Sequence, residues 1–468
     1  MGKCCLSTYK NQVLAIFVLA LLMRIFNLFF LIPDDFDFRL EDQDIYVNLG
    51  LSMLQTGDFV HQTASGFYVE TARTPLYPAF LSAIWSLSGY NPWVVVFFQS
   101  IIDALSCVMI GLIVSQFTSG AFMLGGVLSV FNMNMVTSSG MILTDSLFLF
   151  IFTLFLYSTM VYLNKKDLKY MVLLSIMLSL SILTRPVSYY LIPILGGVFL
   201  WYLISQKVHI TKIFVHITAF ILVIAILLGV LVDRNYRQFG TIAITSQSGL
   251  HLSKYLVPLA IHFSEGKTYS ESAMEVTSMT KRCKSSNLTN KKVNEFELSR
   301  CESGIAIDRL LDLGIAKIAY VWLIGSALNL SSSGVMVAPW LRNLPHQSFY
   351  NTPGDTFIHK IATFITDIES IKYIVVVLIS NFISFLMFVL KCFGVYVMVK
   401  NRKHYIKGWG VFFVLGFIFY FLLITGPVLG VKYMLPIEPL LTILLVIGIR
   451  GVINKRIDIV NIDKYSKF

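Results

Sequence analysis

Long apolar runs, separated by short polar loops, fill most of the chain. A helix crosses the hydrocarbon core of a bilayer with about 20 apolar residues. On this criterion we expect about ten transmembrane helices. They lie near residues 12–32, 93–116, 121–136, 147–163, 170–183, 187–204, 213–232, 373–399, 409–425 and 436–449. The pattern predicts an all-α polytopic membrane protein with short interfacial helices in its first outer loop.

The composition agrees with a membrane protein. Of the 468 residues, 56% are hydrophobic and 13% are charged, whereas soluble domains carry about 25% charged residues. The net charge of +11 does not require a nucleic acid as partner, because Lys and Arg gather in short loops between apolar runs. Basic loops mark the cytoplasmic side, so both termini are expected there. The predicted location is the plasma (inner) membrane, with the lipid bilayer as a partner.

The loops divide the chain into three parts. Residues 1–232 form an N-terminal transmembrane module, which contains an outer loop at 33–92. Residues 233–372 are expected as a large extracytoplasmic region between the seventh and eighth spans. Residues 373–468 carry the last spans and a cytoplasmic tail. The apolar run 314–330 is interpreted as a helix lying on the outer membrane surface, and a further span is the alternative.

Carboxylates cluster in the outer loop. Glu41, Asp42 and Asp44 lead into an apolar stretch that ends at Gly57, which predicts a short helix along the membrane surface. The start of this helix would favour an anion through its dipole, or a divalent ion held between carboxylates. Glu41 and Asp44 are therefore candidate metal ligands, and a divalent metal ion is the candidate cofactor. A solvated acidic loop without a site is the alternative for the carboxylates before Glu41.

Charged residues of both signs are expected at this same outer surface. Arg73 precedes two prolines, Asp145 precedes the fourth span, and Arg185 and Lys432 lie in later outer turns. A carboxylate can act as general base on an acceptor, while Arg and Lys stabilise charge on a departing phosphate. Each residue also has a simpler interpretation. Asp145 would then cap a helix, and Arg185 and Lys432 would reach for the membrane interface.

Three further features lie outside this surface. Asp103 falls within the second span, where a charge is costly and has to face the interior of the bundle. Cys107 and Cys392 sit in apolar runs and are interpreted as packing residues. Cys283 and Cys301 lie in the polar region, where an oxidising compartment would permit a disulfide between them.

The charged positions occur in short motifs with recognisable spacing. In chain order these are Asp42-x-x-x-Tyr46, Gly57, Arg73-x-Pro75-Leu76-Tyr77-Pro78, Thr144-Asp145, Thr184-Arg185-Pro186 and Tyr433-x-x-Pro436. This combination resembles the membrane glycosyltransferases of the C-type (GT-C) fold. The closer resemblance is to the bacterial branch related to protein O-mannosyltransferases and lipid A aminoarabinose transferase. It covers residues 12–186 well and the last two spans more loosely.

The resemblance implies a transferase that moves a sugar from a polyprenyl-phosphate donor to a lipid, glycan or protein acceptor on the extracytoplasmic face. It assigns Asp42 as catalytic base and Asp145 as a second catalytic carboxylate. The expected substrate-binding residues are Tyr46, Glu70, Arg73, Arg185, Lys432 and Tyr433. The chain departs from the family pattern at two positions: Gln43 replaces a common Glu, and Lys432 replaces a common Arg, which binds phosphate in a bidentate manner that Lys cannot match.

Two alternatives remain from the sequence. One is a transporter or flippase of a polyprenyl-linked glycan, which should carry ionisable residues through the middle of several spans. Asp103 is the clearest residue of that kind, so an enzyme is favoured. The other is an oligosaccharide ligase or polymerase, which would share the donor chemistry.

Overall fold

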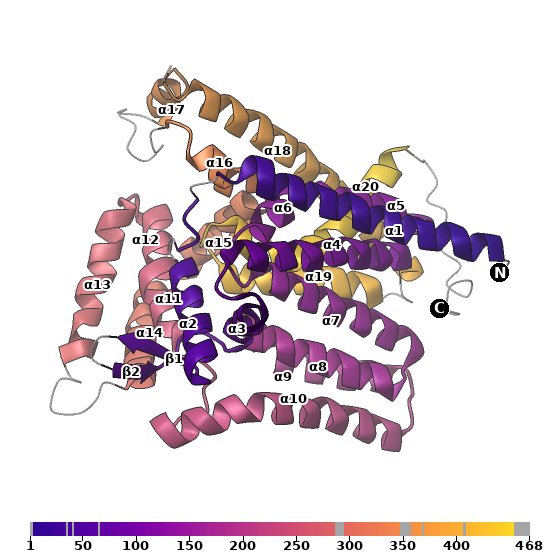
Figure 1. Cartoon of the computed structure of the whole chain (residues 1–468), viewed down its shortest axis with the longest axis horizontal. Coiled ribbons are helices and arrows are strands. Elements are labelled where there is room, and N and C mark those ends of the chain that lie inside the picture. Colours follow the sequence, from indigo (N-terminus) through magenta and orange to yellow (C-terminus); the bar gives the residue numbers. More distant parts are fainter. Residues whose placement is uncertain are drawn as a thin grey trace.

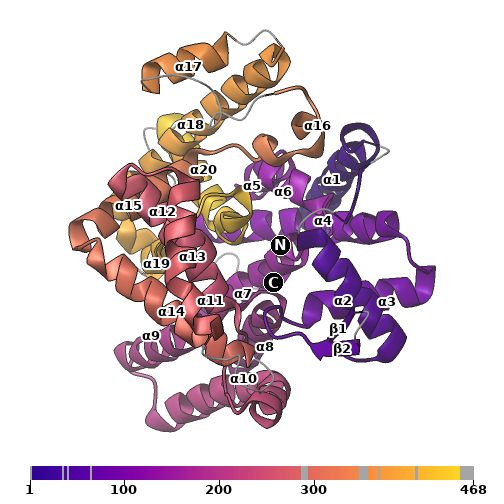
Figure 2. The same ribbon diagram turned by 90° about the vertical axis from the view of Figure 1, so that its left-hand side faces the viewer.

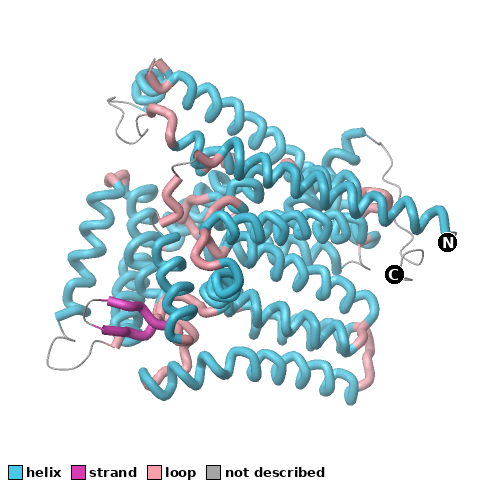
Figure 3. Tube along the Cα trace, in the orientation of Figure 1, coloured by secondary structure: helices cyan, strands magenta, loops and turns pink. Residues whose placement is uncertain are grey.

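The computed structural model describes residues 3–453 except 34–35, 40–41, 64–65, 286–293, 347–356, 367–368 and 406–408. Its main elements are α1 (Lys3–Phe26), α2 (Asp42–Thr56), β1 (Val60–Thr63), β2 (Gly66–Val69), α3 (Leu76–Ser88), α4 (Pro92–Phe117), α5 (Phe122–Val130), α6 (Met133–Ser139), α7 (Asp145–Lys165), α8 (Leu168–Thr184), α9 (Leu191–Ser205), α10 (Ile210–Phe239), α11 (Gln247–His251), α12 (Val257–Glu265), α13 (Tyr269–Ser285), α14 (Glu295–Asp312), α15 (Ile315–Ser331), α16 (Pro339–Arg342), α17 (Phe357–Ile365), α18 (Ile371–Lys400), α19 (Trp409–Thr425) and α20 (Glu438–Ile453). The expectation of an almost entirely helical fold is confirmed, because the strands described form one antiparallel hairpin, β1–β2 (Figure 3).

The helices form a bundle with a polar end. Helix α1 begins at the right-hand end of the bundle, where the loops α7–α8 and α9–α10 also lie, and α12–α14 lie at the left-hand end (Figure 1). The basic residues expected on the cytoplasmic side therefore share an end with the start of α1. We call the left-hand end of Figure 1 the polar end. Seen from this end, α2, α3 and the hairpin lie together on one side, and α12–α15 form a separate group (Figure 2).

Fewer helices than expected are long enough to be clear spans. Among the described residues, seven helices are long and apolar enough to cross a membrane, or eight if α14 and α15, which meet at a bend of 103°, count as one span. Helices α8 and α19 are apolar but shorter. The chain is therefore a multi-span membrane protein, and the expected number of about ten spans stays a prediction.

The expected span at residues 121–136 is wrong in its continuity. The chain breaks after α5, and Asn132 caps α6 by accepting hydrogen bonds from the backbone N–H groups of Asn134 and Met135. Arg24 of α1 is fully buried and donates to the carbonyl oxygens of Val130 (2.6 Å) and Ser129 (3.3 Å). These bonds satisfy the carbonyl groups that an interrupted helix leaves unpaired.

The same arginine settles the position of Asp103. Its Nε lies 2.7 Å from the Asp103 carboxylate, and both side chains are buried. Asp103 thus faces the interior of the bundle, as predicted. It links α1 to α4 as an internal ion pair.

Two close contacts define the rest of the bundle core. Phe152 and Phe155 of α7 pack edge-on against Phe417 of α19, with ring centroids 6.1 and 5.8 Å apart. Helix α18 lies against α20 at Gly394 and Gly448, where an added Cβ would meet the carbonyl oxygens of Leu444 and Leu390 at 1.9 and 2.1 Å. Small residues allow this approach between helices in a membrane.

The helices between α10 and α18 are joined by polar contacts. Cys283 of α13 and Cys301 of α14 form a disulfide. Arg309 of α14 contacts Glu265 of α12 and Glu275 of α13, each at 2.7 Å. These contacts tie three helices into one unit beside the hairpin.

Candidate active site

Asp42 is the first residue of α2 and lies between two cations. Its Oδ1 accepts a hydrogen bond from Arg73 Nη2 at 2.8 Å, and its Oδ2 lies 3.5 Å from Lys432 Nζ. Asp42 remains 42% exposed, so its carboxylate is accessible as well as paired. The helix ends as predicted, with Gly57 at φ 76° donating to the carbonyl oxygen of Met53.

Arg73 is held in place by Glu70 through the backbone. Glu70 Oε1 accepts from the N–H groups of Ala72 and Arg73, while its Oε2 pairs with His61 of β1. Burial raises the pKa of Glu70, but the hydrogen bonds from His61 and from these backbone groups lower it further, so the net shift is downward. Glu70 is only 4% exposed. Its carboxylate is therefore turned towards the chain, and its predicted role in substrate binding stays a prediction.

Asp145 and Arg185 form a second, deeper ion pair. Asp145 is the first residue of α7 and Arg185 follows α8 directly; Arg185 Nη1 donates to Asp145 Oδ1 at 2.6 Å. Asp145 is 3% exposed, and the Arg185 guanidinium lies 5.7 Å from the Phe148 ring centroid. The pKa of Arg185 is raised: its burial acts to lower the value, and the neighbouring Asp145 and Tyr46 more than offset this.

Tyr46 and Tyr433 contact the cations of the Asp42 group. The Arg73 guanidinium lies 5.9 Å from the Tyr46 ring centroid, and Lys432 Nζ lies 5.6 Å from that of Tyr433. Burial raises the pKa of Tyr46. The charges of Arg73 and Arg185 act to lower this pKa, and the charge of Asp42 acts to raise it. Burial acts to lower the pKa of Lys432, while Tyr433, Asp145 and Asp42 raise it overall.

The two pairs therefore belong to one cluster, in which each charge is influenced by the others. The structure brings together seven of the residues singled out from the sequence: Asp42, Tyr46, Arg73, Asp145, Arg185, Lys432 and Tyr433. Their roles in a reaction stay predictions.

The described part of this site does not form a metal centre. Asp44 contacts Arg39 at 3.0 Å and accepts from Asn48 at 2.9 Å, and Asp42 faces two cations. Among the described residues no group of three His, Cys, Asp or Glu side chains is placed to hold an ion. Glu41, the other candidate ligand, lies outside the described residues.

Two residues near the cluster escaped the sequence analysis as functional candidates. Gln43 is 4% exposed, and its Oε1 accepts from the backbone N–H of Ile142 at 2.9 Å, which ties α2 to the loop before α7. His251 of α11 lies close enough to Lys432 for that charge, together with burial, to lower its pKa. Gln43 carried a signal, because it follows Asp42 directly; nothing in the sequence around His251 distinguishes it.

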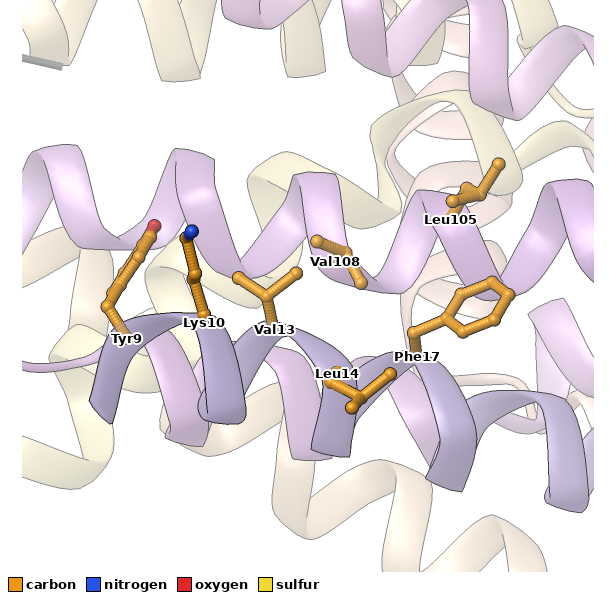
Figure 4. A pocket seen from close by; sticks show the side chains of 7 residues that line it. All are labelled: Tyr9, Lys10, Val13, Leu14, Phe17, Leu105 and Val108. Carbon is orange, nitrogen blue, oxygen red and sulfur yellow. The ribbon is translucent and has the colours of Figure 1, made fainter. Parts of the chain in front are cut away.

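A separate hollow of about 420 Å³ lies between α1 and α4 (Figure 4). Its wall is mostly apolar, with Tyr9 and Lys10 at one end. It lies at the end of α1 away from α2, since the 22 residues from Lys10 to Leu31 span about 30 Å as helix. The hollow is therefore no part of the charged cluster.

Comparison with known proteins agrees with this fold. Residues 72–232 match the family described as dolichyl-phosphate-mannose-protein mannosyltransferase. The archaeal oligosaccharyltransferase AglB from Archaeoglobus fulgidus, solved with an inhibitory peptide and a dolichol-phosphate, has a similar structure with a TM-score of 0.53 at 12% identity. The match covers 95% of this chain and 51% of AglB, so the chain spans about half the length of that protein.

A second structure is ArnT from Cupriavidus metallidurans bound to undecaprenyl phosphate, with a TM-score of 0.36 at 12% identity over 97% of this chain and 78% of ArnT. No curated protein sequence matches the chain.

The fold of the chain is similar to that of this oligosaccharyltransferase. Residues 72–232 are similar to the protein mannosyltransferase family, so the resemblance expected from the sequence motifs is confirmed. The matched segment contains Arg73, Asp145 and Arg185, whereas Asp42 and Lys432 lie outside it.

Proposed function

We propose that the chain transfers a sugar from a polyprenyl-phosphate donor to an acceptor hydroxyl or amine, with Asp42 as general base. The observation that carries this proposal is the pairing of Asp42 with Arg73 and Lys432 beside the Asp145–Arg185 pair. A base and several cations at one polar end of a membrane bundle suit a substrate that joins a sugar, a phosphate and a long apolar chain. The family match and the AglB fold point to the same donor class.

The chemistry requires few protein groups. The acceptor oxygen or nitrogen attacks the anomeric carbon of the donor sugar, and the bond from that carbon to the phosphate oxygen breaks. Asp42 takes the proton from the acceptor. The polyprenyl phosphate leaves with an additional negative charge, which Arg73 and Lys432 stabilise. The Nε of Arg73 is buried without a hydrogen-bond partner in the described part of the chain, so the protein itself does not use this donor.

Asp42 has to leave its cations before it can act as a base. In the ligand-free arrangement Arg73 and Lys432 both contact Asp42, and these are the cations assigned to the phosphate. The phosphate of a bound donor offers these two cations a second anion that can replace the carboxylate. Donor binding then releases Asp42 towards the acceptor. Asp145 and Arg185 are assigned to orienting the sugar or the acceptor from the deeper side of the cluster.

We place the reaction on the extracytoplasmic face of the plasma (inner) membrane. The cluster lies at the end of the bundle away from the start of α1 and the basic loops, and a disulfide joins α13 and α14 nearby. Disulfides persist in oxidising compartments. The acceptor class, whether lipid, glycan or protein, stays open.

The test measures release of free polyprenyl phosphate, because this product forms whatever the acceptor is. Purified protein in lipid nanodiscs is given a panel of undecaprenyl-phosphate sugars and a membrane extract as acceptor source. Wild type should release undecaprenyl phosphate from at least one donor, and Asp42→Asn should not. Asp58→Asn is the matched control, since Asp58 is an exposed carboxylate that follows the same helix. No release above the Asp42→Asn background from any donor would contradict the proposal.

The transporter alternative has less support in the described residues. Its clearest candidate, Asp103, is joined to Arg24 within a set of contacts that closes the break after α5. A transport role would instead require that the donor moves from one leaflet of a vesicle membrane to the other, without release of polyprenyl phosphate. Mass spectrometry of the donor and of polyprenyl phosphate in the inner and outer leaflets of the vesicle separates the two functions.

A further inference from the structure

Lys432 is carried by a segment with little rigidity of its own. Residues 426–430 connect α19 to a single turn of 3-10 helix, Val431–Tyr433, and are not helical. Gly426 and Gly430 have φ values of 58° and 152°, which other residues rarely adopt. A glycine-containing segment of this kind loses much conformational entropy when it is held in one shape. Contacts from elsewhere in the fold therefore have to hold Lys432 near Asp42.

Helix α15 supplies those contacts. Trp322 Nε1 donates to the carbonyl oxygen of Leu423 at 2.9 Å, and a Cβ added to Gly426 would lie 2.8 Å from the same indole. Gly325, one turn further along α15, lies so close that its own added Cβ would meet the Pro427 backbone at 2.6 Å. The helix thus fits closely against the beginning of the segment.

Asn329 holds the end of the segment nearest Lys432. Its Nδ2 donates to the carbonyl oxygen of Val428 at 2.9 Å, and its Oδ1 accepts from the N–H of Gly430 at 3.0 Å. Asn329 is 5% exposed, so water does not compete freely for either bond. The Asn329 side-chain amide thereby fixes both the carbonyl group of Val428 and the N–H group of Gly430. Gly430 lies two residues before Lys432.

We infer that Asn329 is a positioning residue for the proposed donor site, acting through Lys432. This inference rests on the proposed function, because it assigns Lys432 to the donor phosphate. It also gives α15 a role: the helix is a template that presents Lys432 to Asp42. A purely structural role for Asn329 would leave the loss of donor binding independent of Lys432.

The first test is a double-mutant cycle with undecaprenyl phosphate as the probe, measured by binding to protein in nanodiscs. Asn329→Ala should weaken binding about tenfold, since it displaces one charge-assisted contact. In a Lys432→Ala background the same substitution should have no further effect. Ser331→Ala is the matched control on α15, because the Ser331 hydroxyl bonds within its own helix; it should bind like wild type. Equal losses in both backgrounds would overturn the inference.

The second test needs no lipid ligand. Hydrogen exchange of the peptide that contains residues 426–433 should become faster in Asn329→Ala than in Ser331→Ala, while peptides from α7 and α20 keep their rates. Unchanged exchange in this peptide would also overturn the inference. Should Asn329→Ala fail to fold, Asn329→Ser serves both tests, because serine is polar but too short to bridge Val428 and Gly430. Faster exchange without any wild-type binding of undecaprenyl phosphate would refute the proposed donor, while supporting the placement of the segment by Asn329.

Discussion

Replacing Asp42 with asparagine should have opposite effects on two measurable steps. The substitution keeps the shape of the side chain and removes its charge, so Arg73 and Lys432 lose their anionic partner. We expect sugar transfer to fall by about 10²–10⁴-fold, which is the usual contribution of a general base. We expect binding of the donor phosphate to become tighter.

The gain in binding follows from the geometry of the cluster. The Arg73–Asp42 distance is 2.8 Å and the Lys432–Asp42 distance is 3.5 Å, but Asp42 and Lys432 are each 42% exposed. Partly exposed pairs are worth about 0.2–1 kcal/mol each, so freeing both cations should yield about 1 kcal/mol. That free energy corresponds to a dissociation constant about fivefold lower.

The assay is binding of undecaprenyl phosphate to wild type, Asp42→Asn and Asp58→Asn in nanodiscs, alongside release of undecaprenyl phosphate from a sugar donor. Tighter binding with lost transfer supports competition between Asp42 and phosphate for the same cations. Weaker binding by Asp42→Asn would refute this reasoning, because Asp42 would then help to hold the donor. Near-normal transfer would refute its assignment as the base.

Three further predictions follow from the contacts around the cluster. Glu70→Gln should weaken donor binding about three- to tenfold through misplacement of Arg73, since a neutral side chain accepts less strongly from the backbone N–H groups. Because the folded pKa of Glu70 is lowered, its contribution to stability should be present above the unfolded pKa of about 4.3 and lost as the pH falls through the lower folded pKa. This loss should appear as acid-induced exposure of the hairpin in limited proteolysis. Replacing Cys283 and Cys301 with serine should destabilise α13 and α14 by about 3 kcal/mol, as expected for closing a loop of 18 residues, and hydrogen exchange measures this locally.

Each of these predictions has a clear opposite outcome. Wild-type binding by Glu70→Gln would show that Arg73 does not depend on Glu70. If acid exposes the hairpin to proteolysis at the same pH in wild type and Glu70→Gln, protonation of Glu70 is not the cause of the exposure. Non-reducing peptide mapping that finds Cys283 and Cys301 as free thiols would exclude the disulfide.

Local features of the fold could be predicted from the sequence where the signal is itself local. Helix α2 ends at the glycine expected to stop it, and Asp145 begins α7 as its position before an apolar run indicates. The packing of α2 was not predicted: Gly50 lies against Leu81 and Trp85 of α3, where an added Cβ would come within 2.8 and 2.9 Å. Hydropathy does not reveal that Gly50 allows the closest approach.

Features that depend on distant partners could not be predicted in detail. The break between α5 and α6 lies in a run that hydropathy predicts as one span, although Asn132 and Asn134 interrupt its apolar residues. Arg24, about a hundred residues earlier, is buried and donates to the backbone carbonyl groups beside the break. The charged cluster joins Asp42 to Arg73, 31 residues away, and to Lys432, 390 residues away. The sequence placed these residues on one membrane surface, but their pairing, and the inward turn of Glu70, depend on the packed structure.

The most direct measurement is an experimental structure of the protein in nanodiscs with undecaprenyl phosphate bound. We expect phosphate oxygens about 3 Å from the Arg73 guanidinium and the Lys432 amine, with the Asp42 carboxylate released from both and facing the acceptor side. A phosphate bound elsewhere, for example beside Lys10 in the hollow between α1 and α4, with the Asp42–Arg73 pair intact, would contradict this expectation.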